Sequence, residues 1–151
     1  MLYLKNDITE AIGIFNRPQE GWTELTQEEL DAYLLEEAKK AKVEELDLDF
    51  SAFECGGHVY DGNTYCLKKD GIDNIVTVVN GLDPADPNAY TFRDINGVAH
   101  DFETQEAWDA FKLDMITERN RVMVYYIAKK TEINACQTIA EVEAIVIDFS
   151  E

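Results

Sequence analysis

The residues of this chain that could bind a metal ion gather around the stretch "CGGH". Cys55 and His58 stand three positions apart there, Cys66 follows, and Cys136 or His100 could complete a set of four ligands. Thiolates and imidazoles are the usual ligands of structural zinc. On an extended strand, however, residues three apart point to opposite faces, although the two intervening glycines could curl it. Because no second paired motif occurs in the sequence, we expect no metal site and interpret the cysteines as reduced core thiols.

A calcium site is the second possibility, in the stretch "DPADPN". Asp83, Asp86 and Asn88 offer the oxygen ligands that calcium prefers. An EF-hand loop needs a longer regular series and a bidentate glutamate at its twelfth position, and the prolines interrupt that spacing. A solvated acidic loop therefore accounts for this stretch better than a calcium site.

Catalytic chemistry has few candidates in the sequence. His58 and His100 are its two histidines, the residue type best suited to a general base near neutral pH, and neither lies in a nucleophile motif. The sequence contains no glycine-rich loop of the kinds that bind nucleotide phosphates. With 31 carboxylates, some pair lies close together in any fold, so closeness indicates no activity. We predict a protein that is not an enzyme and uses no cofactor.

Composition and charge limit the partners. The 151 residues include 31 Asp and Glu against 13 Lys and Arg, a net charge of −18, and 46% of them are hydrophobic. This apolar content suffices for the core of one domain. The negative charge repels phosphate backbones and anionic lipids, so we expect no direct binding to nucleic acid or membranes, and attraction to a basic protein. The absence of a signal-peptide pattern and of an apolar span predicts a cytosolic protein.

Residues 1–24 are predicted to form an extended segment or hairpin, and residues 25–48 a surface or arm helix. Thr26 occupies the N-cap position of this helix and Glu29 follows three residues later, which is the pattern of a capping box. The apolar stripe is narrow and consists of Leu30, Leu34, Ala38 and Ala41. So little apolar area cannot anchor a helix deep in a core. We expect the helix to lie on the surface, to project as an arm or to pair with another copy.

Residues 49–151 are predicted to form a compact α+β region, within one domain overall. Strands are expected in "FSAFECGGHVY" and "TYCL" around the turn "DGN", and a second hairpin is expected around Asn96-Gly97. Residues 71–81 favour a short helix that ends at Gly81, and their β-branched run leaves a strand as the alternative.

The widest apolar pattern predicts a core helix from Gln105, after an N-cap at Thr104, to about Ala135. Its apolar residues recur at spacings of three, four and seven, and they include Trp108, Phe111, Met115, Val122, Tyr126 and Ile133. Thr138 and Glu141 then form a second capping box at the start of a short final helix. The predicted class is α+β: two short antiparallel β-hairpins packed on a long C-terminal helix, with an N-terminal extended segment and helix.

One charge falls inside the apolar arc of the long helix. Arg119 lies near the line of Trp108 and Tyr126. A cation at such a position must reach water or pair with a carboxylate. Glu37 is the matching irregularity in the stripe of the first helix, so we predict Glu37 as the partner. A snorkelling Arg119 at the edge of the stripe is the alternative.

Four stretches, taken in order, resemble a known family: "GWTELTQEELDAYLLEEAKKAKVEEL", "GGHVYDGNTYCL", "DINGVAHDFETQEAW" and "KKTEINACQTIAEVEAI". Over most of residues 22–146 they are similar to the phage-tail-associated domain of unknown function found in tail-fibre and tail-fibre-assembly proteins. The matching positions are Gly62, Asn63, Tyr65, Asn96, Gly97, Thr104, Glu106, Ile133, Ala135, Thr138, Glu141 and Ile145. Tyr90 and Phe92 stand where this family has a strand tryptophan, and Val142 stands where it has an acidic residue.

The resemblance implies a phage or prophage protein of the tail module and carries no catalytic residue to this chain. We therefore predict a non-enzymatic tail or tail-fibre component or assembly factor that acts by protein–protein contact. Its partners would be other phage tail or tail-fibre proteins, or a second copy of the chain. They would meet in the cytoplasm of the bacterial host during synthesis, or in the virion. The expected contact residues are Trp22, Tyr33, Leu34 and Leu35.

The alternative function is that of an acidic DNA mimic that inhibits a host nucleic-acid-binding protein. The net charge of −18 suits such a protein. A mimic would present its carboxylates in a regular row on one face, and its binding would weaken steeply with salt. The acidic residues of this sequence are spread through loops and helices without such a row.

Overall fold

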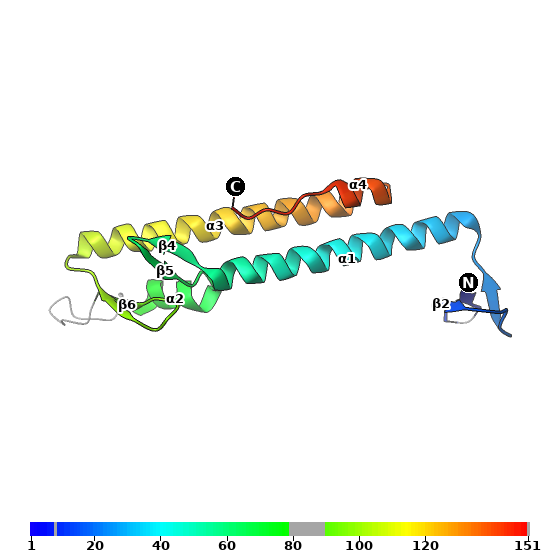
Figure 1. The fold of residues 1–151 in the computed structure, drawn as a ribbon, viewed down its shortest axis with the longest axis horizontal. Helices are drawn as coiled ribbons and strands as arrows, with labels where there is room; N and C mark the ends of the chain where they lie inside the picture. The colour runs from blue at the N-terminus through cyan, green and yellow to red at the C-terminus, as the bar shows by residue number, and fades with distance from the viewer. Residues whose placement is uncertain (8, 79–89, 151) are drawn as a thin grey trace. The chain divides into compact units, whose positions relative to one another are not determined.

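The computed structural model describes residues 1–7, 9–78 and 90–150, with the main chain alone at residues 74 and 76–78. Its contacts divide the chain into two units, one of residues 1–43 with 133–145 and one of residues 44–132 with 146–151. The helices and small antiparallel sheets confirm the predicted α+β class (Figure 1). None of the described helices is both long and apolar enough to cross a membrane.

The first unit begins with a three-stranded antiparallel sheet in the order β2-β1-β3. The strands are β1 (Leu2–Asn6), β2 (Ile12–Phe15) and β3 (Trp22–Glu24). Leu4 of the central strand pairs with a residue on each neighbour and is buried. The N-terminal segment is therefore a hairpin with a third strand added at its other edge.

Helix α1 (Gln27–Gly56) is longer than the sequence pattern predicted. The residues from Phe50 to Cys55, expected to be a strand, are its last turns, so that prediction was wrong. Leu46, Phe50 and Phe53 recur at the helical spacings of three and four, which lets the helix continue. It ends where Gly57 takes a left-handed φ of 80° and donates to the carbonyl of Phe53.

The second unit contains two hairpins. Strands β4 (His58–Tyr60) and β5 (Asn63–Tyr65) confirm the first, with a two-residue turn at Asp61-Gly62. Strands β6 (Thr91–Arg93) and β7 (Ala99–Asp101) confirm the second. Its connection is not the predicted two-residue turn but a five-residue loop, because Asp94 Oδ1 accepts from the N–H groups of Asn96 and Val98, both at 2.9 Å.

The remaining helices follow the sequence pattern closely. Helix α2 (Lys69–Val78) shows that the helical interpretation of residues 71–81 was right and the strand wrong, although the predicted end at Gly81 lies outside the described residues. Helix α3 (Gln105–Ala135) confirms the long core helix. Helix α4 (Ile139–Ala144) begins with the predicted capping box of Thr138 and Glu141.

The core of the second unit forms where α2 and the hairpins meet the first half of α3 (Figure 1). Its buried residues are Tyr65, Leu67, Ile72, Ile75, Trp108, Phe111 and Met115. Phe111 makes ring contacts with Tyr60, Tyr65 and Phe102 at centroid distances of 4.7 to 5.2 Å. Aromatic rings supply large apolar area per residue, so this cluster fixes both hairpins to α3.

Arg119 of α3 has a carboxylate partner, but the partner is Glu54 of α1 rather than Glu37. The guanidinium also donates to the carbonyl of Leu67. Both charged side chains are largely buried, and Glu37 is exposed. The prediction of Glu37 was wrong because the strand expected from Phe50 onward had removed Glu54 from the helix.

Candidate protein contact surface

A capping box closes the N-terminus of α1. The Thr26 N–H donates to Glu29 Oε2 at 2.9 Å, and the Glu29 N–H donates to the Thr26 hydroxyl at 3.2 Å. The Thr26 N–H and the Thr26 hydroxyl, the latter at 3.0 Å, both donate to the Glu29 carboxylate and lower its pKa, because they favour its charged form. A further bond, from the Leu25 N–H to the Tyr3 carbonyl, joins the sheet to the helix start. Hydrogen bonds therefore define the start of α1 and connect it to the N-terminal sheet.

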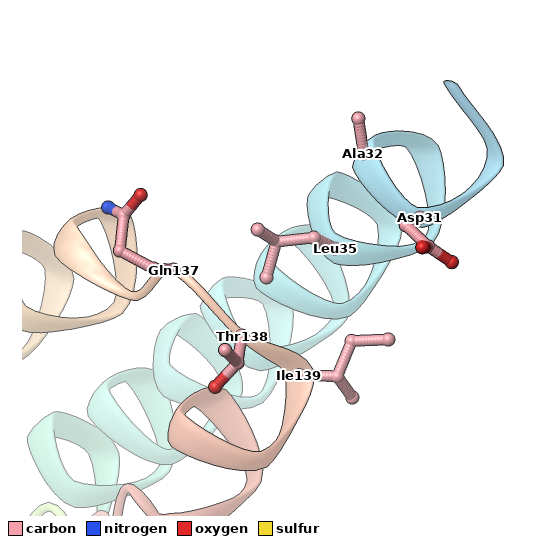
Figure 2. Close-up of a pocket in the computed structure, with 6 residues that line it drawn as sticks. All are labelled: Asp31, Ala32, Leu35, Gln137, Thr138 and Ile139. Carbon is pink, nitrogen blue, oxygen red and sulfur yellow. The ribbon is translucent and has the colours of Figure 1, made fainter. Parts of the chain in front are cut away.

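A hollow of about 360 Å³ lies between α1 and the connection from α3 to α4 (Figure 2). We call it the α4 hollow. Its lining residues are Asp31, Ala32 and Leu35 of α1 with Gln137, Thr138 and Ile139 of the connection and α4. Its volume is in the range of pockets that hold small ligands or a few side chains of a partner.

The polar groups that line the α4 hollow already have hydrogen-bond partners within the chain. Asp31 accepts from Gln27 Nε2 at 2.7 Å, and the Gln137 amide donates to a carbonyl at the end of α3 at 2.8 Å. The Thr138 hydroxyl accepts from the Glu141 N–H at 3.2 Å. What the hollow offers a partner is therefore chiefly apolar contact with Leu35 and Ile139, of which Ile139 is 37% exposed.

A second hollow, of about 370 Å³, lies between α1 and the N-terminal sheet. We call it the sheet hollow. Its lining residues are Lys5, Glu10, Ile12, Leu25, Glu29, Ala32, Tyr33 and Glu36. Lys5 pairs with Glu10 at 3.4 Å, and Glu36 pairs with Lys39 at 3.2 Å, so these charges are also engaged locally. Ala32 lines both hollows, which makes the first half of α1 a ridge between them.

The four predicted contact residues divide unequally over this surface. Leu35 lines the α4 hollow and Tyr33 lines the sheet hollow, where its ring lies 6.2 Å from that of Tyr3. Leu34 is half-buried and lines neither hollow. Trp22 packs edge-on against Phe15 at 5.0 Å in the sheet and also lines neither. Their role as contacts stays a prediction.

The histidines considered for catalysis or metal binding each pair with a carboxylate. His58 Nε2 lies 2.7 Å from Asp114 Oδ2, which links β4 to α3. His100 Nε2 lies 3.1 Å from Asp94 Oδ2, within the second hairpin and its loop. Among the residues that the structure describes, no group of three His, Cys, Asp or Glu side chains is placed to hold a metal ion. The "DPADPN" stretch lies outside those residues.

The α4 hollow could not have been found from the sequence pattern. Its two sides, residues 31–35 and 137–139, are about a hundred positions apart. The capping box at Thr138 indicated where the last helix begins, but local cap chemistry carries no information about which distant helix lies beside it. The sheet hollow was missed for a related reason: the sequence predicted the N-terminal strands but not that they pack beside α1.

The chain matches no protein-family model, no curated protein sequence and no solved structure. The geometry of the two hollows and the charge of the chain are therefore the observations from which a function can be inferred.

Proposed function

We propose that this protein is a non-enzymatic phage or prophage tail-module protein, a tail or tail-fibre component or assembly factor, and that it acts by protein–protein contact through the first half of α1. The observation that carries the proposal is the pair of hollows on either side of this helix. Their polar groups are engaged within the chain, so a partner gains mainly by covering apolar side chains. The resemblance of residues 22–146 to the tail-associated family supplies the biological setting.

The charge of the ridge defines the chemistry of the occupant. Residues 27–38 carry five carboxylates and no Lys or Arg. A segment that places apolar side chains in the hollows brings its flanking residues close to these carboxylates. Basic flanks are favoured there, and acidic flanks are repelled. The occupant is therefore a segment of a tail or tail-fibre protein with apolar anchors and flanking Lys or Arg.

The proposed site of action is the cytoplasm of the bacterial host during synthesis, followed by the assembled particle if the protein is a component. An assembly factor would leave before completion. The net charge of −18 disfavours direct binding to nucleic acid or anionic membranes at either stage. A second copy of the chain is disfavoured as the occupant of this ridge, because like charges would face each other.

The test is an affinity capture of the tagged chain from a lysate of the induced prophage or the native phage infection, at low and high salt, with partners identified by mass spectrometry. The contact variant is Leu34→Ser with Leu35→Ser, and Ile139→Ser removes the opposite wall of the α4 hollow. Leu48→Ser is the matched control, since Leu48 lies on the same helix and is 71% exposed. Thermal melts establish that each variant is folded.

The proposal expects tail or tail-fibre proteins on the wild type and on Leu48→Ser at both salt concentrations, and their loss from the folded contact variants. Unchanged capture by both contact variants would overturn the assignment of the ridge. Recovery of a host DNA-binding protein that is lost at high salt would instead favour the acidic mimic. The exposed carboxylates of α1 point in all directions around the helix, so they do not form the row that a mimic requires.

A further inference from the structure

Two of the three cysteines come together at the end of α1. Cys55 is exposed on the last turn of this helix, and Cys66 directly follows β5. The Cys66 thiol lies 3.6 Å from the carbonyl oxygen of Glu54, which also accepts the Leu67 N–H at 3.1 Å. That carbonyl belongs to the peptide bond that Cys55 shares. The Cys66 thiol therefore lies beside the peptide bond that joins Glu54 to Cys55, although eleven positions separate the two cysteines in the sequence.

Lys68 follows Cys66 closely in the chain, and its N–H donates to Cys66 Sγ at 3.4 Å. The nearby Cys55 raises the pKa of the Lys68 ammonium group, so the lysine stays charged. A neighbouring cation favours the thiolate, which is the nucleophilic form of cysteine. Exposure, a cation and a second thiol are the three features that redox-active cysteines share.

We propose that Cys55 and Cys66 form a redox-active dithiol that hydroperoxides convert to an intramolecular disulfide. In the first step the Cys55 thiolate attacks the peroxide; an S–O bond forms, the O–O bond breaks, and the leaving oxygen takes up a proton. In the second step the Cys66 sulfur attacks the resulting sulfenic acid; the S–S bond forms, and water leaves with the proton of Cys66. The peroxide accepts the two electrons that the thiols lose.

The disulfide would close a loop of residues 55–66 around the β4–β5 hairpin. It would join the end of α1 covalently to the segment that leads into α2, at the place where Arg119 already bridges Glu54 and Leu67. A disulfide requires Cα atoms within about 7 Å of each other. The main-chain bond between Leu67 and Glu54 keeps the two segments in register for this closure.

The test treats the reduced full-length chain with hydrogen peroxide and locates the products by peptide mass mapping under non-reducing conditions. The expected product is a Cys55–Cys66 disulfide, formed in the wild type and in Cys136→Ser, reversed by dithiothreitol, and absent from Cys55→Ser and Cys66→Ser. A higher melting temperature of the oxidised chain should accompany it. Cys55 that ends as sulfinic acid, or that pairs between chains, with no Cys55–Cys66 peptide, would overturn the proposal.

Lys68 is tested as a positioning residue by the rate of disulfide formation. Lys68→Ala should slow oxidation of Cys55 several-fold, and Lys68→Arg should restore most of the rate because it keeps the cation. Cys136 provides an internal reference, since its rate of alkylation should be equal in all three proteins. Equal rates of disulfide formation in Lys68→Ala and the wild type would show that Lys68 does not promote the reaction. If, in addition, Cys55 reacted no faster than Cys136, an activated dithiol would be excluded.

Discussion

Arg119 of α3 pairs with Glu54 of α1, sixty-five residues earlier in the chain, and each side chain is less than one-fifth exposed. The same guanidinium donates a hydrogen bond to the Leu67 carbonyl, just after the first hairpin. One cation therefore joins three elements of the second unit: the end of α1, the segment before α2, and the middle of α3. Removing the Glu54 carboxylate would leave the largely buried Arg119 charge without its counter-charge. The stability of the fold should therefore be sensitive to this pair.

Glu54→Gln should destabilise the chain by about 2–3 kcal/mol, because it leaves a largely buried guanidinium without its counter-charge. The free energy of unfolding in urea measures this change. Glu37→Gln is the matched control: the same substitution on the same helix, at an exposed position, should change stability by less than about 0.5 kcal/mol. Equal losses in the two variants would contradict the assignment of Glu54 as the partner.

Gly57→Ala should unfold or strongly destabilise the chain for two separable reasons. Its φ of 80° is unfavourable for any residue with a Cβ, and that Cβ would lie 2.5 Å from the carbonyl oxygen of Tyr65. Gly62→Ala shares the positive φ, 77°, but meets nothing within 4 Å. It should cost only the backbone term, about 1–2 kcal/mol. Urea unfolding of both variants separates the cost of the positive φ from the cost of the clash with Tyr65. A loss of stability in Gly57→Ala no larger than that in Gly62→Ala would contradict the clash.

Asp94 should make the second hairpin sensitive to acid. Partial burial raises the pKa of its carboxyl, but hydrogen bonds from His100 and from the N–H groups of Val98 and Asn96 outweigh this and lower it. A carboxyl with a lowered pKa in the folded state contributes stability above its unfolded pKa, about 4, and loses it as the pH falls through the folded value. The melting temperature should therefore fall below about pH 4.

Asp94→Asn isolates this effect, because asparagine keeps an acceptor oxygen and does not titrate. The difference in melting temperature between the wild type and Asp94→Asn should shrink as the pH is lowered from neutral to below 4. Both proteins share every other acidic group, so their common losses cancel. A difference that stays constant over this range would show that the charge of Asp94 contributes nothing.

Thr138→Ala should loosen α4 and the wall of the α4 hollow. The Thr138 hydroxyl accepts the Glu141 N–H at 3.2 Å, and loss of such a cap costs about 1 kcal/mol. Thr138→Ser keeps the hydroxyl and should be close to the wild type. Amide hydrogen exchange over residues 137–144 measures the change locally. Identical exchange in the alanine and serine variants would mean that the cap does not hold this segment.

Local chemistry was sufficient to predict where α1, α3 and α4 begin. The Thr-x-x-Glu patterns at Thr26 and Thr138 and the N-cap at Thr104 each form the bonds expected, because a cap involves residues three apart in one turn. The apolar period over residues 105–135 likewise fixed α3 without knowledge of its neighbours. These features depend on residues within a few positions of each other, which a sequence displays directly.

What the sequence alone could not decide are the relationships between distant segments. The end of α1 depends on Gly57 meeting the main chain of Tyr65, the partner of Arg119 depends on that end, and the α4 hollow depends on residues 31–35 lying beside residues 137–139. Several segments have compatible charge and apolar area, so local preference does not choose among them. The choice is made when the whole chain packs, since only then does each contact add to the others that share its core.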